Sequence, residues 1–520
     1  MAAEEALSRL DEPVHAFRTP EGEIGFATNG ECRPGTPASG GGWLPLLGWA
    51  PPLTPADLGD RAFLEEHGVR FPYIAGALAS GIASTRMVVE MGRAGMLGFF
   101  GAAGLEIPVV EAAVRTIHEE LGPGAAWGAN LIHMPLEPDR EMATAELFVR
   151  SGVPSICASA FMKVTPAVVY ARAKGLTRRP DGRIAGPRRI LAKLSRPELA
   201  REFVAPASGA ILEALVAQGR LTAAECELAR RVPLAGDVTI EGDSGGHTDN
   251  RPVLPLLAAV QETAARAAAE HGWARPPRVG AAGGVGTPIE ATALFAAGAA
   301  YVLTGSINQA CVEAGTSDLV KEMLARAELA DADMAPAADM FELGVRVQVL
   351  KRGTLFAARA RRLGELYRAY DSLESIPTEE RANLETRIFR QPIESVWRET
   401  EAYFARRDPI LVEKARANAK QRMALVFRWY LGLSSRWAIQ GVADRSVDFQ
   451  VWCGPAMGAF NQWVRETFLA DPRERRVALV ARNILHGAAA IARARILAVQ
   501  GVPLPPSAFR FAPRRFDELR

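Results

Sequence analysis

Between residues 71 and 305, short apolar runs alternate with longer segments of helical periodicity. Nearly continuous apolar runs are typical of parallel strands that are covered on both faces of their sheet. Eight runs fit this description: 73–77, 95–100, 127–132, 154–159, 189–194, 237–242, 278–283 and 300–305. Eight strand–helix units over about 250 residues match an α/β TIM (β/α)8 barrel, which we predict. An open doubly wound sheet would show the same alternation, so the pattern alone does not choose between them.

The remaining segments are organised around this barrel. Residues 1–60 are rich in Gly and Pro and are predicted to be an N-terminal extension. The barrel is expected over 61–335, with a helical insertion of two helices at about 195–236, because that connection is longer than one helix needs. After residue 335 strand signals mostly stop, and we predict a helical domain over 336–505 followed by a loose basic tail over 506–520.

Composition narrows the class of protein. A net charge of +2 argues against a nucleic-acid binder, which normally carries a strong basic bias. The five cysteines form no C-x-x-C pair, so neither a disulfide framework nor a structural zinc site is expected. The N-terminal residues are acidic and unlike a signal peptide, and no apolar run is long enough to span a membrane. We therefore expect a cytoplasmic protein without a membrane association.

The segment EGDSGGHTDN, residues 241–250, holds the main catalytic candidate. It places His247 directly after Gly245 and Gly246, just beyond the sixth predicted strand. Barrel enzymes gather their catalytic residues at the carboxyl ends of the strands. An imidazole there can donate a hydrogen bond or a proton to a bound substrate or cofactor, and we prefer this hypothesis to a purely structural histidine.

Two glycine-rich turns follow the seventh and eighth predicted strands. They are AAGGVGTP, with Gly283 and Gly284, and YVLTGSINQA, with Thr304, Gly305 and Ser306. Glycines at a strand end let backbone N–H groups approach a phosphate without a Cβ in the way. Barrels often bind phosphate at these two loops, so we predict a phosphate site; two ordinary tight turns are the alternative. A helix opening at Pro288 would aim its N-terminus at the anion.

Two further polar residues end predicted strands. Asn130 could pair with the edge of a heterocycle and Lys193 could hold a negative ring or phosphate, although either could be an ordinary polar strand end. His133, just beyond Asn130, is a weaker candidate. The seven histidines are scattered and show no metal-binding spacing, so no metal is expected.

At these residues the chain resembles the PfaD family, the FMN-dependent trans-acting enoyl reductases of polyunsaturated fatty acid and trans-acyltransferase polyketide biosynthesis. The resemblance runs from about Leu44 to Gly501 and includes GANLIH, ILAKLSRPELA, IEGDSGGHTDNRP, VGAAGGVGTP and YVLTGSINQACVEAGTS in the barrel. FRWYLGLSSRWA and DFQVWCGPAMGAFNQW lie outside it and are not expected in plain nitronate monooxygenases. Small departures occur, such as GALASG in the first loop and IEGDSGG where VEADSGG is commoner.

The resemblance implies a cofactor, a reaction and residue roles. The reaction is reduction of a 2,3-enoyl thioester on an acyl carrier protein by FMN, with NADPH or NADH as the hydride donor. The residues that match family positions are His247 in the active site, Gly245, Gly246, Gly283, Gly284, Thr304, Gly305, Ser306 and Ile307 at the FMN phosphate, and Ala77, Leu78, Asn130 and Lys193 near the ring.

Rival functions and partners complete the expectations. A nitronate monooxygenase-like flavin oxidase, oxidation or isomerisation of a tethered acyl chain, and a catalytically silent scaffold of a synthase complex are the alternatives. An acyl carrier protein within such a complex is the expected partner, and a homodimer is compatible with the sequence. We hypothesise that basic residues form the carrier dock: Arg406, Arg407, Lys414, Lys420, Arg475 and Arg476. A solvated face of mixed charge is an equal alternative, because Glu and Asp are interspersed among them.

Overall fold

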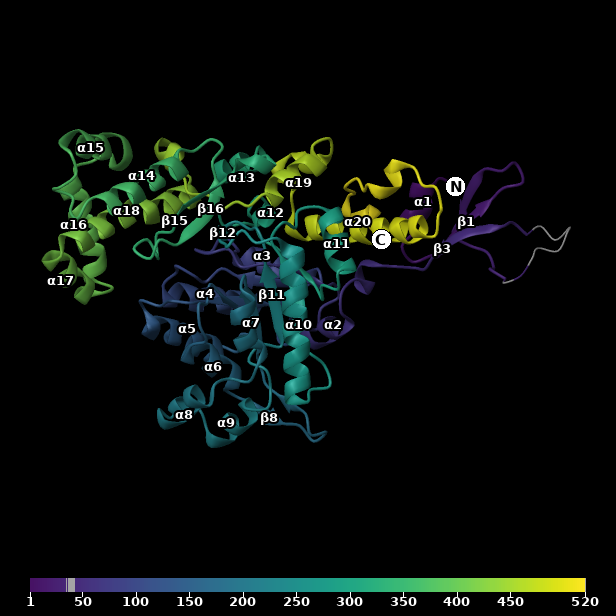
Figure 1. Ribbon diagram of the computed structural model, residues 1–520, viewed down its shortest axis with the longest axis horizontal. Helices are drawn as coiled ribbons and strands as arrows, with labels where there is room; N and C mark the ends of the chain where they lie inside the picture. The colour runs from purple at the N-terminus through teal and green to yellow at the C-terminus, as the bar shows by residue number, and fades with distance from the viewer. Residues whose placement is uncertain (34, 36–42, 520) are drawn as a thin grey trace. The chain divides into compact units, whose positions relative to one another are not determined.

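A computed structural model describes residues 1–33, 35 and 43–519 of the chain. The chain divides into two compact units, and each is described by itself (Figure 1). Unit 1 consists of Met1–Gly242, Arg251–Ala314 and Gln462–Arg520, and unit 2 of Asp243–Asn250 and Gly315–Asn461. In the part of the chain that is described, no helix is long and apolar enough to cross a membrane.

Unit 1 contains a closed barrel of eight parallel strands in the order β10-β11-β13-β14-β4-β5-β6-β7. The strands are β4 (Tyr73–Ala75), β5 (Leu97–Phe100), β6 (Gly128–Ile132), β7 (Ser155–Ser159), β10 (Arg189–Leu194), β11 (Asp237–Glu241), β13 (Arg278–Ala282) and β14 (Val302–Thr304). Each lies inside one of the eight predicted runs. Closure of the sheet confirms the TIM barrel and excludes the open doubly wound alternative.

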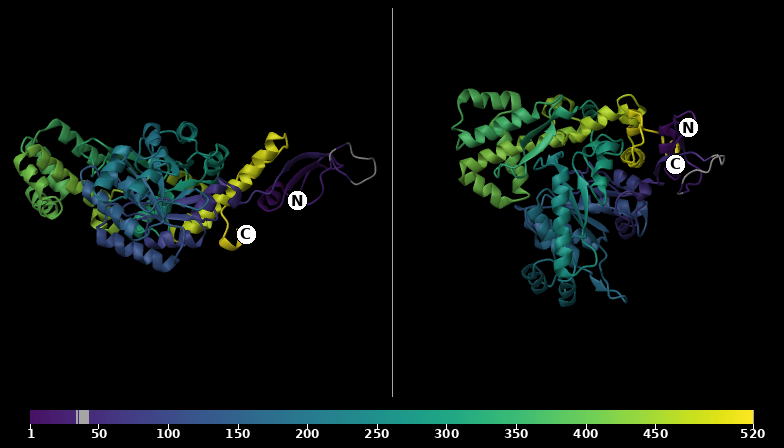
Figure 2. Two further views of the ribbon diagram at one scale, coloured as in Figure 1. Left: turned by 90° about the horizontal axis from the view of Figure 1, so that it is seen from below. Right: turned by 45° about the vertical axis from the view of Figure 1, so that its right-hand side comes forward.

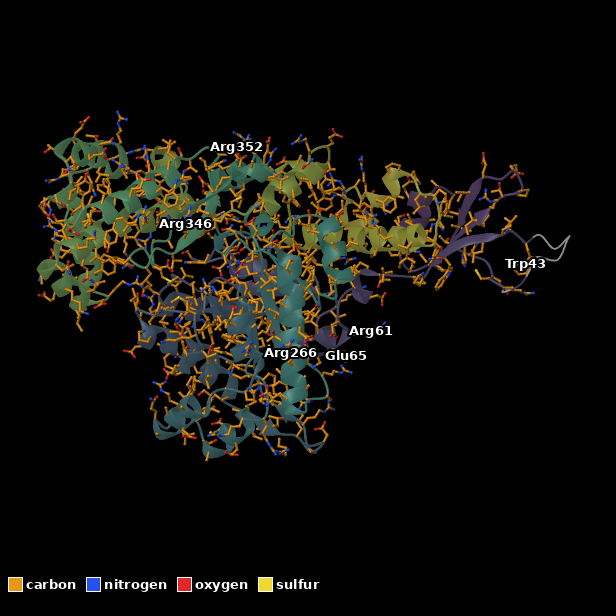
Figure 3. All side chains as sticks on the ribbon, in the orientation of Figure 1. Trp43, Arg61, Glu65, Arg266, Arg346 and Arg352 are labelled. Atoms are coloured by element: carbon orange, nitrogen blue, oxygen red, sulfur yellow. The ribbon has the colours of Figure 1, made fainter. Side chains whose placement is uncertain are left out.

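Helices of unit 1 surround the strands (Figure 2). Those that follow strands directly are α3 (Thr85–Arg93), α4 (Ile107–Leu121), α5 (Pro138–Arg150), α6 (Pro166–Ala173), α7 (Pro197–Val204), α10 (Val253–His271), α11 (Pro288–Ala296) and the short α12 (Ser306–Gln309). Charged side chains such as Glu65, on α2 (Arg61–His67), and Arg266, on α10, point outward into solvent (Figure 3).

The helical insertion differs in detail from the expectation. The segment 195–236 holds three helices rather than two, since α8 (Gly209–Ala217) and α9 (Ala223–Ala229) follow α7. Gly219, just after α8, has a positive φ of 70°, which favours glycine and separates α8 from α9. A small hairpin of β8 (Thr177–Arg178) and β9 (Ile184–Ala185) precedes β10.

Helix α20 (Val477–Val499) belongs to the barrel unit rather than to a separate helical domain. It packs against α11 and also contacts α3, so it supplies the helical cover that the short α12 does not provide after β14. A Cβ on Gly487 would lie 2.6 Å from Cγ of Pro288, at the start of α11. Buried residues line all sides of α20, which is typical of a helix enclosed on every face.

The N-terminal extension packs on the same helix. It contains α1 (Ala3–Ser8) and an antiparallel sheet of β1 (Val14–Arg18), β2 (Ile24–Ala27) and β3 (Leu46–Ala50). Buried Arg493 of α20 donates to the carbonyl oxygens of Leu7, 3.0 Å, and Arg9, 2.7 Å. The tail is not loose as predicted, because Arg482 and Asn483 of α20 donate to its Leu519 and Arg514 carbonyls.

The amino end of the barrel is held by a buried ionic cluster. Asp237, 1 % exposed, accepts Nε2 of His67 at 2.9 Å and two bonds from Arg278, at 2.6 and 2.9 Å. Arg278 also pairs with Glu66 at 2.7 Å. Burial alone would raise the pKa of Asp237, but His67 and Arg278 outweigh it and lower that pKa to about 2. Charged groups at this end stabilise the barrel rather than line its mouth.

Unit 2 contains a small sheet that the sequence did not reveal. The antiparallel strands β15 (Ala332–Pro336) and β16 (Arg346–Leu350) pair with each other, and β16 also pairs with β12 (Gly246–His247). The sequence pattern assigns residues 332–335 to the barrel and 336–505 to helices, and both assignments are wrong for these strands. The residues after β11 that carry His247 form an edge strand of unit 2 instead of a simple barrel loop.

Helices make up the rest of unit 2. They are α13 (Asp318–Ala325), α14 (Phe356–Ala369), α15 (Thr378–Asn383), a π-helical turn (Leu384–Phe389), α16 (Ile393–Ala405), α17 (Pro409–Ala417), α18 (Ala419–Gln440) and the first part of α19 (Ala456–Val464). Their apolar faces form one core, in which Phe389 and Phe427 are fully buried. Trp429, Trp437 and Trp452 pack at its border.

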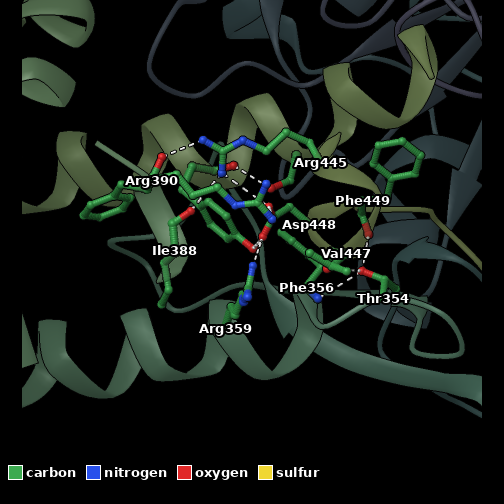
Figure 4. A network of polar contacts seen from close by, with 12 residues as sticks. Thr354, Phe356, Arg359, Ile388, Arg390, Arg445, Val447, Asp448 and Phe449 are labelled. Atoms are coloured by element: carbon green, nitrogen blue, oxygen red, sulfur yellow. Dashed lines mark hydrogen bonds and ion pairs between the residues drawn. The ribbon is translucent and has the colours of Figure 1, made fainter. Parts of the chain in front are cut away.

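A buried aspartate links four segments of this core (Figure 4). Asp448 has no exposed surface and pairs with Arg359, with Arg390 at 3.4 Å and with Arg445 at 3.3 Å. The hydroxyl of Tyr430 donates to it at 2.9 Å. Such a carboxylate offsets the cost of its burial only while its cationic partners remain. We therefore regard Asp448 as the polar centre of unit 2.

Candidate functional site

The glycine turn after β13 leaves open backbone at the carboxyl end of the barrel. Gly283 and Gly284 have φ of +83° and +75°, a conformation that favours glycine. A Cβ on Gly283 would lie 2.7 Å from the carbonyl carbon of Gly242, whereas a Cβ on Gly284 would meet no atom within 4 Å. The first glycine thus permits close packing, and the second borders open space.

The turn after β14 joins the neighbouring loops. Thr304 is buried, and its hydroxyl bonds to the Tyr73 hydroxyl at 2.7 Å and accepts from Asn308 at 3.0 Å. Its side chain therefore serves the fold; Gly305 follows it, and Ser306 and Ile307 begin the short helix α12. Gly305 is uncrowded, since a Cβ added there would meet no atom closer than a methyl group of Leu78, 3.8 Å away.

Helix α11 begins at Pro288 as predicted, but its N-terminus is already capped. The Thr287 hydroxyl accepts the Ile289 N–H at 3.3 Å, and the Glu290 carboxylate accepts the Thr287 N–H at 2.6 Å. An acidic side chain at this position satisfies the helix end itself. The glycine backbone, rather than this helix, is the feature that suits an anion.

The loops after β4 and β5 meet beside Asn130. The Asn130 Oδ1 accepts the N–H groups of Ala102 at 2.8 Å and of Ala103 at 3.3 Å, and its amide nitrogen lies 3.4 Å from the Ser159 hydroxyl. Leu78 follows β4, and its carbonyl accepts the Ala83 N–H at 3.1 Å. Ala77 packs against the barrel core. Asn130 thus fixes the β5 loop, and its contact with a flavin stays a prediction.

Lys193 and Glu241 form an ion pair at the carboxyl ends of adjacent strands. Nζ of Lys193 lies 2.6 Å from Oε1 of Glu241. Their side chains are 21 % and 12 % exposed. Burial lowers the pKa of Lys193, but the charge and hydrogen bond of Glu241 together with the nearby Cys157 outweigh this effect, so the pKa lies above its ordinary value. Lys193 is therefore a cation at neutral pH.

His133 is enclosed by a separate network. Its Nδ1 lies 2.9 Å from the Glu141 carboxylate, which also accepts the Met134 N–H at 2.7 Å and the Thr165 hydroxyl. Burial raises the pKa of Glu141, but the hydrogen bonds from His133 and Thr165 lower it below its usual value. The ring stacks on Phe161, so this histidine ties the β6 loop to the start of α6.

His247 lies in unit 2, on the strand β12. Its Nε2 is 3.3 Å from Oδ1 of Asp339, and its side chain is 30 % exposed. Burial raises the pKa of Asp339, but the hydrogen bond from His247 brings it below its ordinary value. A carboxylate partner of this kind fixes the orientation of the imidazole. His247 is thus a partly exposed, oriented imidazole, as a donor to a substrate requires.

Gly245 and Gly246 each require glycine, for separate physical reasons. A Cβ on Gly245 would lie 2.9 Å from the backbone nitrogen of Cys453, so the close approach of these two segments of unit 2 requires glycine. Gly246 has φ of +84°. Buried Gln348 donates to Asp243 at 2.9 Å and to the Ser244 carbonyl at 3.0 Å and thereby holds the segment in place. A role at the phosphate remains a prediction for both glycines.

Sequence reasoning missed Glu241, Asp339 and Gln348. Glu241 could have been found, because it ends a predicted strand directly before the histidine segment. Asp339 and Gln348 gave no signal, since they are distant in sequence from His247 and lie in a region predicted as helical. Among the described residues no cluster of histidine, cysteine or carboxylate groups could hold a metal ion.

The comparisons with known proteins decide the family. The enoyl reductase domain of MlnA, from the macrolactin biosynthesis cluster of Bacillus amyloliquefaciens, is 38% identical, with a TM-score of 0.81, and the match covers 85% of this chain and 99% of that one. The chain belongs to the PfaD family of trans-acting enoyl reductases. FabK from Thermotoga maritima shares the fold at 16% identity, with a TM-score of 0.51 and coverage of 85% and 98%.

Curated relatives of this PfaD-family chain are longer proteins. A polyunsaturated fatty acid synthase component of Thraustochytrium is 45% identical over 90% of this chain and 30% of its own length. The polyketide biosynthesis protein PksE of Bacillus subtilis is 42% identical over 83% and 56%. The chain thus spans about a third to a half of these two relatives. Residues 370–449 match the family model of the [acyl-carrier-protein] S-malonyltransferase inserted helical domain.

Proposed function

We propose that the protein reduces the 2,3-double bond of enoyl thioesters carried on an acyl carrier protein, using FMN and NADPH or NADH, in polyketide or polyunsaturated fatty acid biosynthesis. The observation that carries this proposal is the near-complete match to the MlnA enoyl reductase domain. The synthase relatives support the setting, since one is a polyunsaturated fatty acid synthase subunit and another a polyketide biosynthesis protein.

The carboxyl end of the barrel fits a flavin phosphate. Gly284 borders open space, and the backbone at Gly305 is uncrowded by side chains. These turns, with Ser306 and Ile307, would hold the phosphate, joined by Gly245 and Gly246. The residues that would surround the ring are Ala77, Leu78, Asn130 and Lys193. FMN, when bound, supplies hydride transfer between a nicotinamide and an alkene.

The chain's own residues would position the substrate and supply protons. His247, oriented by Asp339, is proposed to donate a hydrogen bond or a proton to the thioester. A donor to the carbonyl oxygen stabilises the negative charge that develops there when the β-carbon accepts hydride. Replacement of His247 by Gln keeps a hydrogen-bond donor but removes the acid, so the two roles can be separated.

The structure shortens the set of basic residues that could bind a carrier protein. Arg475 is 1 % exposed and donates to the Leu469 carbonyl at 2.8 Å, so it is not available to a partner. Lys420 donates to backbone carbonyl groups of Tyr367 and Tyr370. The exposed Arg406 and Lys414 remain candidates for attracting an acidic carrier protein.

The test uses the purified chain with two substrates. Mass spectrometry of the released cofactor should identify FMN, and NADPH oxidation should depend on an enoyl thioester and yield the saturated thioester. A small nitronate should be turned over at a far lower rate. Reaction with the nitronate alone would support the oxidase alternative, and absence of bound flavin would support the scaffold alternative; either outcome contradicts the proposal.

A further inference from the structure

The ion pair of Lys193 and Glu241 lies at the barrel mouth beside the glycine turn. Lys193 is in register with Ser159 of β7 on one side and with Thr239 of β11 on the other. Glu241 is in register with Ala282, the residue before Gly283. The pair therefore stands between the Asn130–Ser159 contact and the turn assigned to the phosphate, all within unit 1.

Partial exposure distinguishes Lys193 from Asn130 and His133 at this edge. The Lys193 side chain retains 21 % exposure, whereas Asn130 and His133 are buried and bonded to protein groups. An amide such as Asn130 carries no acidic proton, and the His133 Nδ1 is held by Glu141. Lys193 combines an acidic N–H with access to the mouth.

Two titratable groups face the ammonium. Glu241 contacts it directly, and the thiol of Cys157, on β7, interacts with it through space. Burial raises the pKa of Cys157 to about 11, so that thiol is neutral at physiological pH. Glu241 is thus the group that contributes most to raising the pKa of Lys193 against the effect of burial.

We propose that Lys193 is the catalytic acid that protonates the α-carbon, with Glu241 as its positioning residue; this rests on the proposed function. FMN, when bound, would supply the hydride that adds to the β-carbon, which leaves the electron pair of the former C=C bond on the α-carbon and carbonyl. The Nζ–H bond then breaks as the proton joins the α-carbon, and the neutral amine regains a proton from water. His247 keeps the role of hydrogen-bond donor to the carbonyl oxygen.

The first test separates the two half-reactions in K193R. Arginine keeps the positive charge that a flavin ring would meet but does not release its proton at neutral pH. We expect K193R to retain FMN. Under anaerobic conditions, the rate of reoxidation by an enoyl thioester, divided by the rate of reduction by NADPH, should fall about 10²-fold or more. K174R is the matched control, because Lys174 pairs with Glu225 at 3.3 Å away from the mouth.

The second test needs no turnover. An amine-acylating reagent labels the neutral form of a lysine amine. The rate of labelling of Lys193 in the purified chain, measured by mass spectrometry, therefore reports the neutral fraction of its amine. In E241Q the Lys193 amine stays buried but loses the negative charge of Glu241, so the pKa of Lys193 should fall. Its labelling rate should rise about tenfold for each unit by which the pKa falls. E225Q is the control that should leave the labelling of Lys193 unchanged.

The outcomes distinguish the two proposals. If reduced parent enzyme is not reoxidised by the enoyl thioester, the proposed function fails and the acid role falls with it. If the parent is reoxidised and K193R is equally fast, or K193R loses its FMN, only the acid role of Lys193 is overturned. Equal labelling of Lys193 in E241Q and the parent would overturn the positioning role of Glu241.

Discussion

The glycine turn after β13 offers a matched pair of variants, Gly283→Ala and Gly284→Ala. Both residues have positive φ, +83° and +75°, so alanine at either site meets backbone strain of about 1–2 kcal/mol. At Gly283 the new Cβ would also lie 2.7, 2.9 and 3.0 Å from the C, N and Cα atoms of Gly242. These backbone atoms cannot rotate away, and relieving the overlap should cost a further ~1–3 kcal/mol. We expect G283A to lose about 2–5 kcal/mol of unfolding free energy and G284A about 1–2 kcal/mol.

The affinity for FMN should order the two variants differently from their stability. A methyl group at Gly284 enters the open space proposed for the phosphate, so G284A should weaken FMN binding about tenfold or more despite its small loss of stability. The control is G272A, at the end of α10, where φ is +66° and a Cβ also meets no atom within 4 Å. Urea unfolding of the apo-protein and titration of FMN by fluorescence measure the two quantities. The reasoning is refuted if G284A binds FMN as tightly as G272A, or if G283A is no less stable than G284A.

Other predictions concern the ionic clusters and the carrier dock. Asp448→Asn should lose about 3–5 kcal/mol of unfolding free energy, measured with urea, because three buried or half-buried arginines lose their counter-charge. The control is Asp318→Asn, which should lose almost nothing because the Asp318 side chain is 95 % exposed. Equal stability of the two variants would contradict this account. The pKa of Asp237 falls from 3.8 to about 2 on folding, so about 2 kcal/mol of stability is present above pH 4 and disappears as the pH approaches 2. Asp237→Asn should abolish that part of the acid slope, and an unchanged slope would assign it to other groups. Arg406→Glu should raise the KM for a carrier-linked substrate but not for a short thioester mimic; an equal rise for both would exclude a docking role.

The barrel was predictable because each of its strand–helix units is local. Every strand is a short, nearly continuous apolar run, and the strands follow one another in the sheet as they do along the chain. Helix α20 was not predictable in the same way. Its composition shows that it is buried, but only the folded chain shows that it covers the barrel beside α11. The strands β15 and β16 were missed because the polar residues Asp333 and Gln348 interrupt their apolar pattern.

The residues of the candidate site likewise divide into those that a local sequence pattern reveals and those that only the folded chain reveals. Residues at strand ends, such as Lys193 and Gly284, were found because a strand end defines the barrel mouth. The packing partner of Gly245, at Cys453, is far along the chain, and no local pattern marks it. The sequence led us to treat Gly245 as a phosphate-binding position, whereas the structure supplies a packing reason that is sufficient by itself.

The central claim is that this chain moves hydride through a bound flavin to an enoyl thioester. The most direct measurement is anaerobic: the flavin of the purified protein is reduced with one equivalent of NADPH, and an enoyl thioester is then added. The account predicts that the thioester restores the oxidised flavin spectrum and is recovered as its saturated product. A flavin that stays reduced until oxygen is admitted, with the alkene unchanged, would contradict it.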